Sequence, residues 1–147
     1  MLGSLPILCG VSCIASANPA CVATTMTFEA AESLLHLGNF EIRMEGAEPK
    51  APPSLWEGPL TIRNLVNGGL CLAQPDGLIT GPVVAFDERF LVISTTSGSN
   101  YTLETIDLNT CVITANSGKY SSPVVFSKPR FLVKGAPVAV LPCPEIR

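Results

Sequence analysis

Hydrophobic and polar residues alternate with a period of two along much of the second half of the chain. The pattern is visible in PVVAFDERFLV (82–92), YTLETIDL (101–108) and PVVFSKPRFLV (123–133). Such alternation is typical of strands that bury one face. The runs are separated by Gly, Pro, Asn and Asp, which favour turns. The pattern therefore predicts an all-β fold of short antiparallel strands.

The expected strands lie near residues 60–66, 83–93, 101–107, 111–115, 123–127, 130–134 and 137–141, the second of them broken by a turn at Asp87 and Glu88. The expected core consists of Val83, Val84, Phe90, Val92, Leu103, Ile106, Val124, Val125, Phe131 and Val133.

The two Pro-Val-Val segments belong to an internal repeat. Residues 82–92 and 123–133 match at seven of eleven positions, and each follows a cysteine (Cys71 or Cys111) and a glycine turn. A period near 40 residues is typical of β-propeller blades, but closed propellers use at least four blades. We therefore expect an incomplete propeller-like or a sandwich-like stack of small sheets. A plain β-sandwich with accidental similarity is the alternative.

The repeat units are placed near residues 60–99 and 100–141. The first half of the chain is less regular. We expect a strand start and one or two helical turns in MTFEAAESLLHL (26–37), a strand in FEIRMEG (40–46), and an ordered surface loop in AEPKAPPSLWEGP (47–59).

The first seventeen residues carry no charged side chain and end in Ala15-Ser16-Ala17. A short apolar run with a small-x-small ending is typical of a secretory signal peptide, and it is shorter than the about 20 residues of a membrane span. We therefore predict a signal peptide at 1–17, a single β domain at 18–147 and export of the chain. The alternative is a buried N-terminal strand or helix.

Four cysteines remain after the predicted leader, namely Cys21, Cys71, Cys111 and Cys143. An even number in an exported domain predicts two disulfides, whereas four buried thiols would fit a cytosolic protein. Spacing leaves three pairings open. If the repeat units are blades, Cys71 and Cys111 occupy equivalent strands and lie far apart, so a bond between them is disfavoured.

The sequence offers few residues for catalysis. The single histidine, His36, has apolar neighbours, and a structural, partly buried role is favoured over a catalytic one. Asp87 and Glu88 are adjacent, which in a strand points their side chains to opposite faces. No phosphate-binding loop and no metal-ligand spacing occurs. We expect a protein that is not an enzyme and needs no cofactor or metal.

Charge and loop composition instead favour a binding protein. The net charge is −3 and the nine basic residues are not clustered enough for a nucleic-acid surface. Residues 94–100 (STTSGSN) carry no large apolar side chain between two strands, which predicts a long polar loop. The expected partner contacts are Thr96, Ser97, Gly98, Ser99 and Asn100. The alternative is a flexible exposed turn without a partner.

The order of motifs in residues 68–143 resembles the periplasmic immunity proteins of type VI secretion amidase effectors of the first family. The shared features are FLVIST, a TSGS loop, and YTLETIDLNTC with an Asp-x-x-x-Cys motif from Asp107 to Cys111. The resemblance implies a partner that is a peptidoglycan-cleaving cysteine amidase with a Cys-His pair. It implies that Ser97, Gly98 and Ser99 enter the active-site cleft, whereas Asn100 stands where the family has a second serine.

Two other functions stay open. A secreted or periplasmic β-repeat module could bind a glycan, but few aromatic residues besides Trp56, Tyr101 and Tyr120 are available as platforms. A lysozyme inhibitor would aim basic residues at an acidic catalytic pair, for which Lys128 and Arg130 are the candidates. If residues 94–100 are only a turn, the contact surface could lie around Trp56 and the Pro-rich segment.

Overall fold

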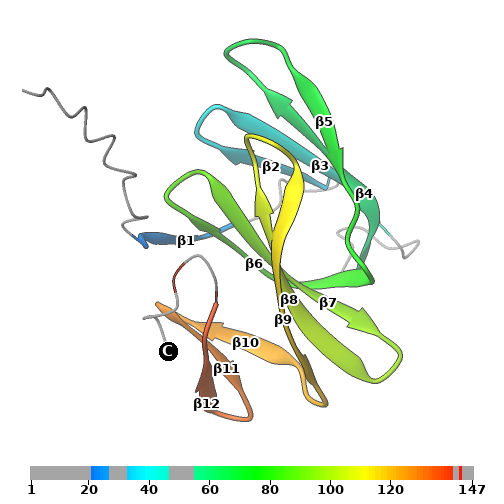
Figure 1. The fold of residues 1–147 in the computed structure, drawn as a ribbon, viewed down its shortest axis with the longest axis vertical. Coiled ribbons are helices and arrows are strands. Elements are labelled where there is room, and N and C mark those ends of the chain that lie inside the picture. Colours follow the sequence, from blue (N-terminus) through cyan, green and yellow to red (C-terminus); the bar gives the residue numbers. More distant parts are fainter. Residues whose placement is uncertain (1–20, 27–32, 47–54, 141–142, 144–147) are drawn as a thin grey trace, which may run out of the picture.

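The structure, a computed structural model, describes residues 21–26, 33–46, 55–140 and 143 (Figure 1). Every regular element in these residues is a β-strand, and every strand pair is antiparallel. The predicted all-β, antiparallel class is therefore confirmed. The predicted leader at 1–17 lies outside the described residues.

Twelve strands form two sheets. The strands are β1 (Ala23–Thr25), β2 (Leu34–Leu37), β3 (Phe40–Gly46), β4 (Trp56–Asn64), β5 (Leu70–Ala73), β6 (Leu78–Phe86), β7 (Phe90–Ser97), β8 (Asn100–Asp107), β9 (Val112–Tyr120), β10 (Val124–Ser127), β11 (Arg130–Val133) and β12 (Ala136–Val138). The larger sheet has the order β2-β3-β4-β6-β7-β8-β9, with β1 paired to β6 and β5 paired to β4. Strands β10, β11 and β12 form the smaller sheet.

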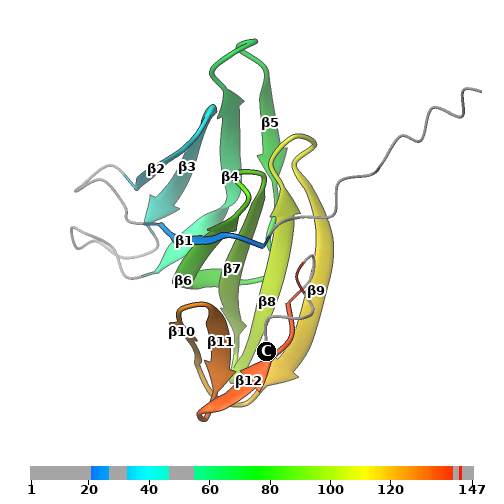
Figure 2. The ribbon, with the colours of Figure 1, turned by 90° about the vertical axis from the view of Figure 1, so that its left-hand side faces the viewer.

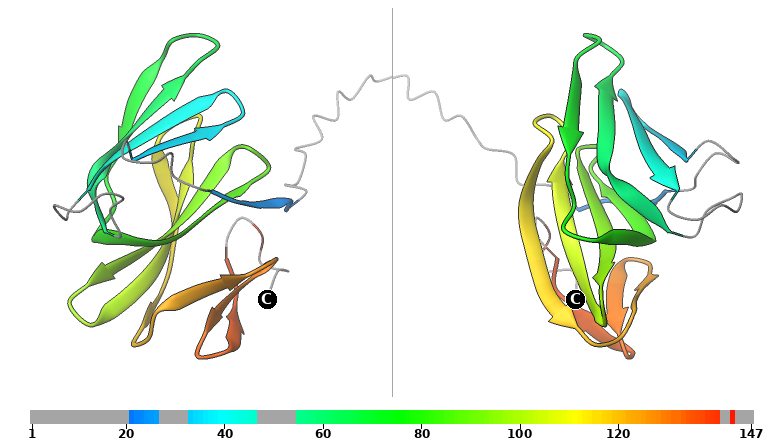
Figure 3. Two further views of the ribbon diagram at one scale, coloured as in Figure 1. Left: turned by 180° about the vertical axis from the view of Figure 1, so that it is seen from behind. Right: turned by 90° about the vertical axis from the view of Figure 1, so that its right-hand side faces the viewer.

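The smaller sheet lies at one end of the molecule (Figure 1). Figures 1 and 3 show the β10–β12 sheet at one end and the hairpin of β4 and β5 at the other. Four aliphatic side chains of this β4–β5 hairpin are exposed, namely Leu65, Val66, Leu70 and Leu72. The middle of the molecule is formed by β6, β7 and β8, which therefore carry a core on each face.

Strand β7 is apolar at successive positions because both of its faces are covered. Leu91 and Ile93 face a core shared with β2–β5, whereas Val92 faces a core shared with β1 and the β10–β12 sheet. Successive side chains of a strand point to opposite faces, so a strand covered on both sides needs apolar residues in both registers. The run FLVI at the start of β7 satisfies this need.

Most of the predicted core is confirmed. Val83, Val84, Val92, Leu103, Ile106, Val124 and Phe131 are buried. Phe90 and Val133 are only half-buried, and Val125 is wrong as a core residue because it is 57% exposed.

The repeat explains the error at Val125. Both Pro-Val-Val segments form hairpins, but the first has Phe86 opposite Phe90 and the second has Ser127 opposite Arg130. The turn of the second hairpin is therefore one residue shorter, which changes the pairing register. A register change of one residue moves side chains to the other face. Residues at equivalent repeat positions thus differ in burial.

The two repeated hairpins pack against each other and do not lie as equivalent units of one sheet. Val84, Phe86 and Val92 of the first hairpin share a core with Val124 and Phe131 of the second. Figure 2 shows the β10–β12 sheet beside β6 and β7, turned away from their plane.

In the first half of the chain the structure corrects two predictions. The stretch predicted to be helical holds strand β2 at Leu34–Leu37, which pairs with the correctly predicted strand β3. Strand β4 begins at Trp56, inside the predicted surface loop, because Trp56 pairs with both Gly46 and Ile79. Residues 56–59 of that predicted loop thus belong to β4, Leu55 precedes the strand, and residues 47–54 lie outside the described part.

Two disulfides join the four cysteines, as predicted. Cys21 is bonded to Cys143 and Cys71 to Cys111. The expectation that Cys71 and Cys111 lie far apart is wrong, because the larger sheet curves until β5 meets the turn between β8 and β9. Blade equivalence, on which that expectation depended, does not hold for these strands. Paired disulfides are typical of extracellular or periplasmic proteins.

Candidate functional site

The predicted contact residues lie together at the tip of the β7–β8 hairpin. The two strands pair as far as Ser97 and Asn100, so only Gly98 and Ser99 form the turn. The prediction of a long loop at 94–100 is therefore wrong. A two-residue connection is the commonest hairpin turn. What the tip presents is a narrow ridge of backbone and small side chains.

The hydroxyl residues before the tip belong to strand β7. Ser94 and Thr95 are buried, and Thr95 Oγ1 lies 2.7 Å from Thr102 Oγ1 on the facing strand. Thr80 Oγ1 lies within hydrogen-bonding distance of Ser94 Oγ, at 3.5 Å. Small polar residues can thus continue a strand when their hydroxyls are paired across it.

Beyond Thr95, exposure increases toward the turn. Thr96 is half-buried, and the four residues from Ser97 to Asn100 are exposed. Gly98 has φ +63°, and a side chain there would meet no atom within 4 Å. This positive φ suits glycine, and the open space shows that the ridge projects into solvent.

Two hollows adjoin the ridge, and Ser97 lines both. The first has a volume of about 290 Å³ and the second about 450 Å³. The first is lined by Asp76, Gly77, Thr95, Ser97, Asn100, Thr102, Asn116 and Lys119. The second is lined by Glu57, Gly58, Gln74, Pro75, Asp76, Gly77, Leu78, Thr96, Ser97 and Gly98. Both hollows share a wall formed by the segment between β5 and β6.

That wall is held against the hairpin by backbone and side-chain contacts. A Cβ at Gly77 would overlap the carbonyl oxygen of Thr96, so this close approach requires glycine. The amide N–H of Asp76 donates to Glu104 Oε1 at 3.2 Å. The Asp76 carboxylate accepts a bond from Asn116 Nδ2 at 3.3 Å. The wall is therefore anchored to both β8 and β9.

Glu104 is the buried acid of this region, and the sequence interpretation did not single it out. Its side chain is inaccessible to solvent. Burial raises the pKa of Glu104, the nearby Asp76 charge raises it further, and hydrogen bonds from Asp76 and Thr95 oppose the shift. Period-two alternation could have found it, because Thr102, Glu104 and Ile106 share one register.

We predict that Glu104→Gln reduces the pH dependence of stability. An acid whose pKa is raised by folding stabilises the fold at low pH, and that contribution is lost as pH rises through the raised pKa. The variant lacks this loss and keeps an oxygen that can accept from Asp76 N–H. Urea unfolding at about pH 4 and pH 7 measures how much the free energy of unfolding changes between the two pH values. Glu88→Gln, at an exposed turn, is the control, and equal pH slopes in Glu104→Gln and the wild type would contradict the prediction.

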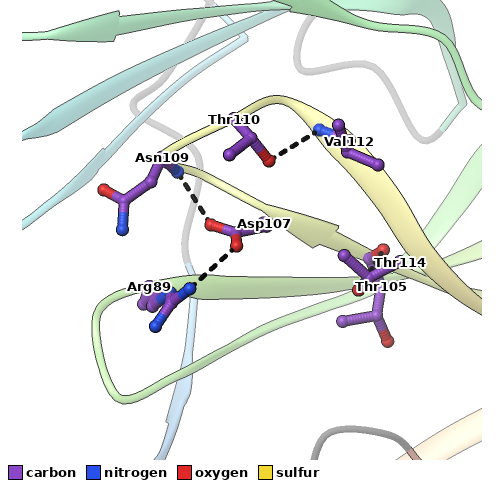
Figure 4. Close-up of polar contacts among 7 residues, drawn as sticks. All are labelled: Arg89, Thr105, Asp107, Asn109, Thr110, Val112 and Thr114. Atoms are coloured by element: carbon purple, nitrogen blue, oxygen red, sulfur yellow. Dashed lines mark hydrogen bonds and ion pairs between the residues drawn. The ribbon is translucent and has the colours of Figure 1, made fainter. Parts of the chain in front are cut away.

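The Asp-x-x-x-Cys motif forms the turn that ends β8. Figure 4 shows Asp107 between Arg89 and the backbone of Asn109: its carboxylate lies 3.1 Å from Arg89 Nη2 and accepts from Asn109 N–H at 3.0 Å. The Asp107 carbonyl accepts from Cys111 N–H at 2.8 Å. Cys111 then has φ +60° and reaches Cys71. The motif thus builds the disulfide-bearing turn.

Other candidate residues have structural positions. Asp87 accepts hydrogen bonds from the amides of Cys21 and Val22 and so holds β1. His36 is exposed on β2, which corrects the expectation of partial burial. Trp56 is buried and donates from Nε1 to Ser33 Oγ at 3.1 Å, so its ring offers little surface to a partner or glycan.

The described residues offer neither a metal site nor a membrane-spanning helix. They contain no group of three or more His, Cys, Asp or Glu residues placed to hold a metal ion. None of the described segments is a helix with the length and apolar character needed to cross a membrane.

The sequence matches no known protein-family model, and comparison with curated proteins finds no significant match. The functional interpretation therefore depends on the geometry of the β7–β8 tip and on the motifs that surround it.

Proposed function

We propose that the protein is a periplasmic immunity protein that inhibits a peptidoglycan-cleaving cysteine amidase of a type VI secretion system. The proposed contact is the β7–β8 tip, from Thr96 to Asn100. The observation that carries the proposal is the shape of this tip, a narrow exposed ridge with two hollows beside it. A ridge of this shape is complementary to an active-site cleft, whose rim would occupy the hollows.

The chemistry of the tip suits a Cys-His site. Such a site presents an imidazole, a thiolate and oxyanion donors. The hydroxyls of Ser97 and Ser99 can accept or donate hydrogen bonds without filling much volume. Gly98 lacks a side chain, so the backbone can approach the catalytic groups closely.

The rigidity of the ridge also supports inhibition. Paired strands and the anchored wall at Asp76 and Gly77 hold the ridge, so little conformational freedom is lost on binding. Export of the chain, which the two disulfides support, would bring it to the compartment of peptidoglycan. In this proposal the protein blocks the active site of the amidase and catalyses no reaction itself.

We predict that Ser97→Arg with Ser99→Arg weakens binding to the amidase by about 1–3 kcal/mol, which is roughly fivefold to 150-fold. The arginines add volume that a narrow cleft cannot accept, and they remove two hydroxyls. The melting temperature should stay nearly unchanged because both serines are exposed. Titration calorimetry with a type VI secretion cysteine amidase of the first family measures the affinity.

The matched control is Asn39→Arg with Asn109→Arg, which adds the same charge at exposed positions in the β2–β3 and β8–β9 turns. This control should bind as the wild type does. Normal binding by the Ser97 and Ser99 variant would contradict the proposed contact, and absence of binding by the wild type would contradict the proposed partner.

A further inference from the structure

The β10–β12 sheet has an inner and an outer face of different character. On the inner face, Phe131 pairs with Phe126 and Val138 and packs in the core. On the outer face, Leu132 pairs with Val125 and Pro137. Val125 and Pro137 are exposed and Leu132 is half-buried. The outer face thus carries an apolar row that no described part of the chain covers.

Three cations surround this apolar row. Lys128 and Arg130 lie at the turn between β10 and β11, and Lys134 lies at the turn between β11 and β12, at the opposite end of β11. All three are exposed. A hollow of about 370 Å³ lies beside Lys128 and Arg130 and is lined by Ser127, Lys128, Pro129, Arg130, Leu132, Gly135 and Pro137.

The charges of the chain are strongly segregated around this sheet. Residues 1–107 contain eleven acidic and four basic residues, whereas residues 108–144 contain four basic residues and no acidic one. The protein as a whole is therefore acidic while the β10–β12 sheet is basic. An anionic surface would attract this sheet and repel the rest of the molecule, which fixes the orientation of binding.

We infer that the outer face of the β10–β12 sheet docks on an anionic phospholipid surface. Lys128, Arg130 and Lys134 meet lipid phosphates, and the apolar row contacts the interfacial region between them. Figure 2 shows this sheet at one end of the molecule, where a planar surface can reach it.

The composition of the face favours lipid over an acidic protein partner. Protein interfaces depend on buried aromatic anchors and arginine, and the outward positions of β10, β11 and β12 hold no aromatic residue. Stacking on nucleic-acid bases also needs aromatic side chains. Long flexible cations beside small apolar residues suit a fluid surface of phosphates, and this inference is independent of the amidase proposal.

The test is co-sedimentation of the full mature chain with vesicles of phosphatidylglycerol and phosphatidylcholine. We expect binding that falls sharply in high salt and is absent with pure phosphatidylcholine. The variant Lys128→Gln, Arg130→Gln, Lys134→Asn should bind roughly a hundredfold more weakly, at about fivefold per cation. Asparagine is used at Lys134 because its φ of +50° suits that residue.

The matched control is Arg43→Gln, Arg63→Gln, Lys119→Gln, which removes the same charge from exposed positions elsewhere. It should retain binding within a few-fold. Three outcomes would overturn the inference: no binding to the anionic vesicles, an equal loss in the control, or equally strong binding of soluble polyglutamate, which would indicate an acidic protein partner. Melting temperatures of both variants verify that they are folded.

Discussion

Replacing Cys21 and Cys143 with serine is expected to lower the free energy of unfolding by about 4–5 kcal/mol. The bond joins residues separated by 122 positions, so its loss frees the unfolded chain over almost the whole domain. It also fixes β1 and the C-terminal segment to one core, in which Cys143 is fully buried. Urea unfolding of the oxidised proteins measures the loss.

The Cys71–Cys111 pair provides the comparison. Its sequence separation is 40 residues, so the same entropy argument gives a smaller loss of about 4 kcal/mol. The order of the two losses is the informative result. A loss below about 2 kcal/mol for the Cys21 and Cys143 variant would show that the termini contribute little to the cooperative fold.

Phe131→Ala is expected to cost about 3–5 kcal/mol. The ring is fully buried, and its centroid lies 4.9 Å from that of Phe126 and 6.4 Å from that of Phe86. Phe131 therefore joins the core that the β10–β12 sheet shares with Phe86 of β6. Removing the ring leaves a cavity between the two sheets, and both sheets would have to shift to fill it.

Phe90→Ala is the matched control, because Phe90 holds the same repeat position in the first hairpin. Its ring is half-buried, with the Arg89 guanidinium 4.9 Å from its centroid. We expect a loss of at most about 2 kcal/mol, since less apolar area leaves water on folding. Chemical denaturation of both variants measures the two losses in free energy of unfolding. Equal losses would contradict the different packing of the two hairpins.

The strands and most of the core could be predicted because period-two alternation is a local property. The FLV segments at 90–92 and 131–133 both form strands. The exposure of Val125 could not be predicted, because it depends on a turn that is one residue shorter than in the first hairpin. The Cys71–Cys111 pairing depends on the curvature of the larger sheet, which is set by contacts far apart in sequence.

The position of the candidate site could be predicted, but its form could not. Small polar residues at 94–97 favour a loop on composition alone. In the fold, hydroxyl pairing between Thr95 and Thr102 keeps them in strands. The hollows beside Ser97 depend on Gly77 and Asp76, which contact the hairpin only after the strand order is established.

The most direct test of the proposed inhibition is the rate at which iodoacetamide alkylates the catalytic cysteine of the partner amidase. Occlusion by the β7–β8 tip predicts that one equivalent of the wild-type chain slows this alkylation strongly. The Ser97→Arg, Ser99→Arg variant, which is expected to bind more weakly, should slow the alkylation less at the same concentration. If the wild-type chain binds the amidase but the cysteine is alkylated at the free rate, the tip does not occupy the active site.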